Sequence, residues 1–154
     1  MTIIIASTRM NAFHLIISIK NNMRKYRIIQ KLIFLIYLAA VAYLCLGHFS
    51  NIHNVPRMIW GIPTDKWVHF IMFFPFPVLF YWAFNWNTKK WWHSLLLSVG
   101  ILAAGSLVAS STELLQGLTT YRTKDILDFH ADFKAMCISS VIVLVIESIK
   151  TLKK

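Results

Sequence analysis

The chain has 154 residues, 57% of them hydrophobic, and a mean hydropathy of +0.59. An ordinary soluble domain is only about 45–50% apolar, so this composition excludes that class and indicates an integral membrane protein. Sixteen Lys and Arg residues against six Asp and Glu residues give a net charge of +10. Basic residues that flank membrane spans and attract anionic lipid account for this charge, so we predict membrane lipids, and no nucleic acid, as partners.

Four apolar segments are long enough to cross a bilayer, which takes about 17–25 residues in a helix. They are residues 32–49, 67–84, 92–115 and 133–149. Unbroken helices are expected, because backbone groups in lipid must be satisfied within the segment, and the alternating pattern of a membrane β-barrel is missing from the sequence. We therefore predict an all-α integral membrane protein with four transmembrane helices.

The basic residues beside these segments predict the orientation. Lys and Arg favour cytoplasmic loops, and they gather before the first span, between the second and third, and after the fourth. Both termini are therefore predicted to be cytoplasmic, with the other two connections on the outer face. The predicted domains are a basic cytoplasmic N-terminal segment at 1–30, a four-helix membrane domain at 31–149 and a basic cytoplasmic tail at 150–154.

The first 22 residues allow two interpretations. Residues 1–19 are moderately apolar and include Arg9, but no clear small-residue cleavage site is present, which argues against a signal peptide and leaves a helix at the membrane interface. Alternatively, translation starts at Met23, and the Arg-Lys-Tyr-Arg that follows it is the cytoplasmic flank of the first span.

The second span opens with three polar residues, Asp65, Lys66 and His69. Asp65 and His69 are four residues apart and share a helical face, where the carboxylate can orient or charge the imidazole. The alternative is that Asp65 only caps the helix. Farther along, Pro75 and Pro77 each remove a backbone hydrogen bond, so we expect the span to kink there.

The third span becomes polar toward its outer end. Gly105 and Ala109 are four residues apart and suit close helix contact. Glu113 comes near the C-terminal end, where the helix dipole opposes a negative charge, so it needs a cation, a proton or a hydrogen-bond donor. We predict that Glu113 and Gln116 face a ligand. The candidate partners for a purely structural ion pair with Glu113 are Arg122, Lys66 and Lys134.

The last loop and the fourth span add four more charged residues. Arg122 is a fork-shaped donor that can grip a carboxylate or phosphate through two hydrogen bonds. Asp125, Asp128 and Asp132 fall at i, i+3 and i+7, on one face of the fourth helix as it enters the membrane. Asp125 and Asp128 can instead form an N-terminal cap. Asp132 lies deeper, and we expect Lys134 or a bound cation to offset its charge.

Two polar motifs carry a resemblance to a known family. They are Asp65-Lys66-x-x-His69-Phe70 at the start of the second span, and Glu113-Leu114-Leu115-Gln116 with Arg122, Asp125 and Asp128 between the third and fourth. Over residues 31–149 the chain resembles the VanZ-like membrane proteins, with the specific matches confined to these motifs. It departs from the family where Asp132 replaces the usual Asn, Ala135 a common Gly and Phe73 a frequent Tyr.

The resemblance implies an envelope function. The family's named member is associated with low-level resistance to teicoplanin, a lipoglycopeptide that acts at the outer face of the bacterial membrane. The resemblance therefore implies a multi-pass protein of the bacterial cytoplasmic membrane, with its polar residues around an outer-face site. The sequence does not predict an oligomeric state.

Three functions fit these residues. The favoured one is a protein that binds or modifies an envelope ligand, such as a lipid headgroup, a cell-wall precursor or a lipoglycopeptide. The second is a membrane enzyme in which His69 and paired carboxylates act as acid and base on a lipid-linked substrate, with a divalent metal held by Asp125, Asp128 and Glu113. The enzyme is less favoured because the spacing fits no standard metal motif and no Ser or Cys nucleophile is evident. We expect no cofactor, with a divalent metal as the alternative. The third is a structural or partner-binding subunit.

Overall fold

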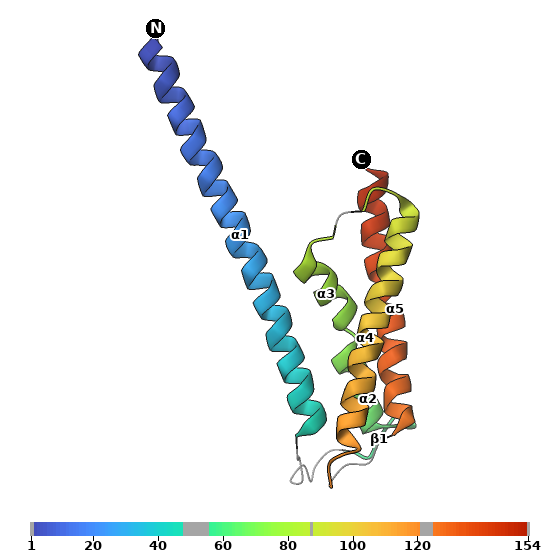
Figure 1. The fold of residues 1–154 in the computed structure, drawn as a ribbon. Helices are drawn as coiled ribbons and strands as arrows, with labels where there is room; N and C mark the ends of the chain where they lie inside the picture. The colour runs from blue at the N-terminus through green and yellow to red at the C-terminus, as the bar shows by residue number, and fades with distance from the viewer. Residues whose placement is uncertain (1, 48–55, 87, 121–124, 154) are drawn as a thin grey trace.

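The computed structural model describes residues 2–47, 56–86, 88–120 and 125–153, with side chains in the first helix described from residue 16 onward. Its elements, in chain order, are α1 (Thr2–Leu46), β1 (Met58–Ile59), β2 (Ile62–Pro63), α2 (Thr64–Phe73), α3 (Phe76–Phe84), α4 (Trp91–Gln116) and α5 (Ile126–Leu152). The two short strands form an antiparallel hairpin directly before α2 (Figure 1).

Four helical stretches are long and apolar enough to cross a membrane. They are Ile16–Leu46, Thr64–Phe84, Trp91–Gln116 and Ile126–Leu152. Much of their apolar surface faces outward, and the side chains of Ile36 and Leu107 are 67% and 71% exposed. Apolar exposure of this extent on every span suits a lipid environment rather than water. The prediction of an all-α protein with four candidate spans is confirmed.

The boundaries of the first and last spans differ from the prediction. α1 is a single helix of 45 residues that includes most of the predicted N-terminal segment, because the sequence from Thr2 to Leu46 contains no Gly or Pro to end it. α5 begins at Ile126, seven residues before the predicted start, because Asp125 caps it. Asp128 and Asp132 therefore lie within its first two turns.

The second span is interrupted at its prolines, as predicted. α2 ends at Phe73 and α3 begins at Phe76, since Pro75 has no N–H to continue the helix. The hydroxyl of Tyr37 in α1 donates a hydrogen bond to the Met72 carbonyl oxygen at 2.7 Å. A side-chain donor at this point satisfies a backbone acceptor beside the break, which lipid could not do.

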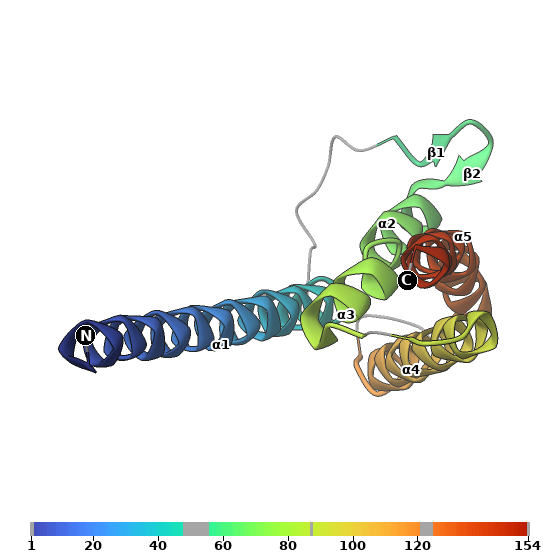
Figure 2. The ribbon, with the colours of Figure 1, turned by 90° about the horizontal axis from the view of Figure 1, so that it is seen from above.

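The helices pack as a bundle with α1 at its edge. α4 and α5 lie side by side, α2 and α3 cover α5, and the N-terminal half of α1 extends away from the other helices (Figures 1 and 2). The core at the centre contains Phe73, Phe76, Ile101 and Met136, all at most 1% exposed. This arrangement brings the start of α2, the end of α4 and the start of α5 to one end of the bundle.

Gly105 provides a test of how closely α4 is packed. A Cβ atom added there would lie 2.3 Å from the Met136 sulfur and 2.9 Å from the Phe76 ring, whereas one added at Gly100 in the same helix would meet nothing within 4 Å. We expect Gly105→Ala to lower the free energy of unfolding by about 1–3 kcal/mol through overpacking.

The matched control is Gly100→Ala, which is expected to raise the free energy of unfolding by up to about 1 kcal/mol, because alanine favours the helix. Both variants would be unfolded in mixed micelles by increasing amounts of dodecyl sulfate. Equal changes in the free energy of unfolding for Gly105→Ala and Gly100→Ala would contradict the packing described for Gly105.

Candidate functional site

A polar cluster lies at the end of the bundle where α2 and α5 begin and α4 ends. Its members come from these three helices and from the residue that caps α5, and most of them are buried. They are Lys66, His69, Glu113, Asp125, Asp128 and Asp132. The two motifs that the sequence placed on one side of the membrane therefore meet at one end of the bundle.

Lys66 joins α2 to the start of α5. Its ammonium group contacts the carboxylates of Asp125 and Asp128, and lies 3.1 Å from that of Asp65. The Lys66 side chain is only 12% exposed, so its charge depends on these carboxylates. The contact with Lys66, together with the Leu127 N–H, lowers the pKa of the Asp125 carboxyl below its ordinary value. Asp65 lies at the rim, with its side chain 55% exposed.

His69 is held by Asp132. The imidazole Nδ1 lies 3.1 Å from Asp132 Oδ1, and Nε2 lies 3.6 Å from Asp128 Oδ2. His69 is 4% exposed and Asp132 is fully buried. The expectation that Lys134 offsets Asp132 is wrong, because Lys134 is exposed on another face of α5. Of the two interpretations of Asp65, neither is observed: its carboxylate contacts Lys66 rather than His69, and α2 has no side-chain cap hydrogen bond.

Glu113 reaches the N-terminus of α5 from α4. Its Oε2 accepts a hydrogen bond from the Asp125 backbone N–H at 3.2 Å, where the dipole of α5 favours a negative charge. Its Oε1 has no hydrogen-bond partner within the part of the chain that the structure describes, although Glu113 is only 2% exposed. A buried carboxylate oxygen without a donor is costly.

The cap of α5 uses a different partner from the one predicted. The Asp125 carboxylate accepts the Leu127 N–H at 2.8 Å, so its capping role is confirmed. In a local capping box the Asp128 side chain would reach back to the Asp125 N–H. Glu113 from α4 takes that place, and Asp128 contacts Lys66 instead.

Two further candidates have different outcomes. Gln116 is 1% exposed and donates a hydrogen bond to the Cys45 carbonyl oxygen at 2.9 Å, so it ties α4 to the end of α1 rather than facing the cluster. Arg122 lies outside the described residues. Its predicted role as an anion-binding side chain therefore stays a prediction.

The cluster contains atoms that suit a divalent metal ion. Each of His69, Glu113 and Asp128 offers one ligand atom, and these three atoms lie within 4.8 Å of one another. All three residues are buried. One imidazole nitrogen with carboxylate oxygens is a donor set that Zn²⁺ and related ions accept. This group shares Glu113 and Asp128 with the set of Asp125, Asp128 and Glu113 considered for the enzyme function, and it contains His69 where that set has Asp125. Asp65, Asp125 and Asp128 form a second, more exposed group.

A second polar network, which was not predicted from the sequence, lies at the opposite end of the bundle. Glu147 of α5 is fully buried, and its carboxylate accepts hydrogen bonds from the Tyr81 hydroxyl and from the Thr88 N–H at 2.6 Å. Lys150 donates to the Tyr81 hydroxyl at 2.6 Å. Glu147 is a lone carboxylate inside the predicted span 133–149. A charge within a span costs free energy and commonly has a functional or structural role, so this residue could have indicated the network.

Comparisons with known proteins identify no relative. No family model, no curated protein and no solved structure matches the chain. The resemblance to the VanZ-like proteins therefore remains an inference from the two sequence motifs.

Proposed function

We propose that the protein is a VanZ-like, multi-pass protein of the bacterial cytoplasmic membrane whose polar cluster binds a ligand of the cell envelope at the outer face. The candidate ligands are a lipid headgroup, a cell-wall precursor and a lipoglycopeptide antibiotic. The observation that carries this proposal is the buried Oε1 atom of Glu113, for which the described residues provide no hydrogen-bond donor. An amine or hydroxyl of a ligand at this position would supply a donor to it.

The rim of the cluster supports access by such a ligand. The side chains of Asp65 and Asp125 are 55% and 36% exposed. They lie beside Lys66 and Asp128, whose side chains are 12% and 11% exposed. Hydroxyl or ammonium groups of a sugar or peptide would donate to these carboxylates. A phosphate or carboxylate of the ligand would compete with Asp125 for Lys66.

A second candidate function is acid–base or metal-assisted chemistry on a lipid-linked substrate. It is favoured by the contact of Asp132 with His69 Nδ1, which leaves Nε2 facing Asp128. A carboxylate commonly orients histidine in this way in metal sites and in acid–base sites. Measurement of bound metal in purified wild type and in His69→Ala tests the metal-assisted form of this candidate, which requires metal in the wild type that the variant loses.

The proposed binding function is tested by teicoplanin susceptibility of a sensitive host. The host would express wild type, Glu113→Gln or the control Lys134→Gln at matched membrane levels. We expect wild type and Lys134→Gln to protect. Glu113→Gln is expected to protect poorly, because a hydrogen bond to a charged group contributes about 1.5–3 kcal/mol, or roughly 10- to 100-fold in affinity.

The outcomes separate the candidate functions. Protection that Glu113→Gln retains in full would contradict a ligand-facing role for this carboxylate. Loss of the Glu113→Gln protein from the membrane would favour the structural function. If no protein protects, the antibiotic is excluded as the ligand, and the same variants would be compared for binding of lipid-linked cell-wall precursors.

A further inference from the structure

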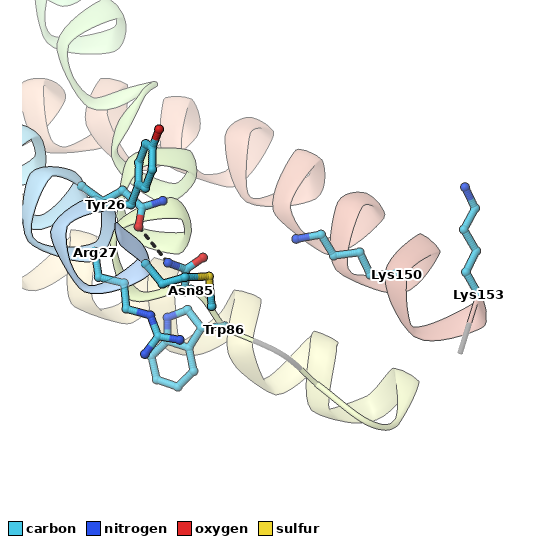
Figure 3. A pocket seen from close by; sticks show the side chains of 8 residues that line it. Tyr26, Arg27, Asn85, Trp86, Lys150 and Lys153 are labelled. Atoms are coloured by element: carbon cyan, nitrogen blue, oxygen red, sulfur yellow. Dashed lines mark hydrogen bonds between the residues drawn. The ribbon is translucent and has the colours of Figure 1, made fainter. Parts of the chain in front are cut away.

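A basic groove lies at the end of the bundle opposite the polar cluster. It is a hollow of about 740 Å³ between α1, the end of α3 and the C-terminal turns of α5 (Figure 3). Its charged lining residues are Arg27, Lys150 and Lys153, and no acidic residue of the described part of the chain lines it. Figure 3 shows Arg27 and Trp86 on one side of the groove, with Lys150 and Lys153 of α5 on the other.

The groove holds three cations, of which Lys150 is partly offset by the buried Glu147 carboxylate, because both groups contact the Tyr81 hydroxyl. Among residues 16–47, 56–86, 88–120 and 125–153, no salt bridge involves Arg27, Lys150 or Lys153. Three cations around one hollow repel one another, so an anion between them would be favoured. The groove therefore suits a ligand with a negative charge.

Two contacts hold the walls of the groove in place. Asn85 at the end of α3 donates a hydrogen bond to the Gln30 side-chain oxygen of α1 at 2.8 Å. Lys150 donates to the Tyr81 hydroxyl and lies 4.8 Å from the centre of that ring. The ammonium group of Lys150 has three N–H donors, so two are left for a ligand.

The surroundings of the groove are those of a membrane interface. Tyr26 and Trp86 line it, and Lys89 and Lys90 follow in the connection to α4. Tyrosine and tryptophan collect at the level of lipid headgroups, and basic pockets between spans bind anionic lipids there. A soluble anion would not need these aromatic residues.

An apolar hollow adjoins the groove through Trp86. It has a volume of about 520 Å³ between α3 and α4, and its lining residues include Phe80, Leu96, Leu97 and Gly100. Trp86 lines both hollows. A molecule with a charged head and an apolar chain would therefore find a surface for each part.

We propose that the basic groove binds the headgroup of an anionic phospholipid, with its phosphate between Arg27 and the two lysines of α5 and an acyl chain along the apolar hollow. This site is separate from the polar cluster and does not depend on the function proposed for that cluster. The bound lipid would link α1 to α5, which the described residues join through α3 and α4.

The test compares lipid binding by the full chain in detergent micelles. Phosphatidylglycerol or phosphatidylcholine would be titrated, and the apparent affinity would be taken from the rise in melting temperature. The variant Arg27→Gln/Lys153→Gln removes two groove charges from exposed positions. We expect it to bind phosphatidylglycerol about tenfold more weakly, because each basic residue near an anionic lipid adds to its attraction.

The matched control is Lys89→Gln/Lys90→Gln, which removes the same charge from exposed positions outside the groove. It is expected to change the affinity less than twofold, within the range of weak surface electrostatics. A second groove variant, Gln30→Glu, retains an acceptor for Asn85 but adds a negative charge, and it is expected to weaken phosphatidylglycerol binding as well.

Three outcomes would overturn the proposal. Equal weakening by both double variants would show a diffuse surface attraction, and unchanged affinity in the groove variants would place lipid elsewhere. Competition by soluble glycerol phosphate at the same concentration as phosphatidylglycerol would show a site for free phosphate rather than for lipid. Selective loss in the groove variants, without such competition, supports the lipid site.

Discussion

Replacing Asp132 with alanine is expected to lower the free energy of unfolding by about 3 kcal/mol. A buried donor that loses its acceptor costs about 1–3 kcal/mol, and truncating a fully buried side chain leaves a cavity that adds to this cost. The His69 Nδ1 atom would lose the contact that Asp132 Oδ1 now makes at 3.1 Å.

Two variants control for this result. Asp132→Asn keeps an oxygen that accepts from His69, so it is expected to cost less than half as much as alanine. Lys134→Ala changes an exposed charge two residues away and is expected to change stability by no more than about 0.5 kcal/mol. Unfolding in mixed micelles would be followed by circular dichroism. Similar losses for Asp132→Ala and Lys134→Ala would contradict the buried pairing of Asp132 with His69.

Replacing Glu147 with alanine is expected to destabilise the opposite end of the bundle by a similar amount, about 3 kcal/mol. The carboxylate accepts from the Tyr81 hydroxyl and from both the N–H and the hydroxyl of Thr88. Each buried donor that loses its acceptor costs about 1–3 kcal/mol. Because Thr88 lies in the connection between α3 and α4, that connection would be partly released from α5, keeping the contact of Thr88 with the Thr151 hydroxyl at 3.1 Å.

Limited trypsin digestion gives a local measurement of this release. Lys89 and Lys90 follow Thr88 directly, so cleavage after them is expected to be faster in Glu147→Ala than in wild type. Glu147→Gln retains one acceptor oxygen and is expected to be intermediate. Asp132→Ala, which acts at the other end of the bundle, is the control for general loosening. Equal acceleration in both alanine variants would contradict a local role for Glu147.

Several features could be predicted from the sequence because they depend on neighbouring residues. The interruption of the second span follows from Pro75, which lacks an N–H wherever the helix lies. Asp125 caps α5 because a side chain at that position reaches the first free N–H groups of its own helix. The close approach at Gly105 follows from small residues four positions apart.

Partners from other helices could not be predicted in this way. The contact between His69 and Asp132 joins residues 63 positions apart. It depends on how α2 and α5 are rotated about their axes, which local spacing does not specify. The same reason explains why Asp65, although four residues from His69, turns outward instead. It also explains why the cap of α5 is completed by Glu113 from another helix.

By itself, the sequence determined that the chain is built from apolar helices of membrane-spanning length, because hydropathy and length are properties of each segment alone. It also indicated that the charged residues of the polar cluster need partners, because a charged side chain in lipid without a partner has a high free-energy cost. The partners of these charges depend on tertiary packing, because a buried charge can pair only with groups that neighbouring helices bring within reach. The packing of α2 and α4 against α5 pairs Lys66 with Asp128 and His69 with Asp132, and the described residues provide no hydrogen-bond donor for one oxygen of Glu113.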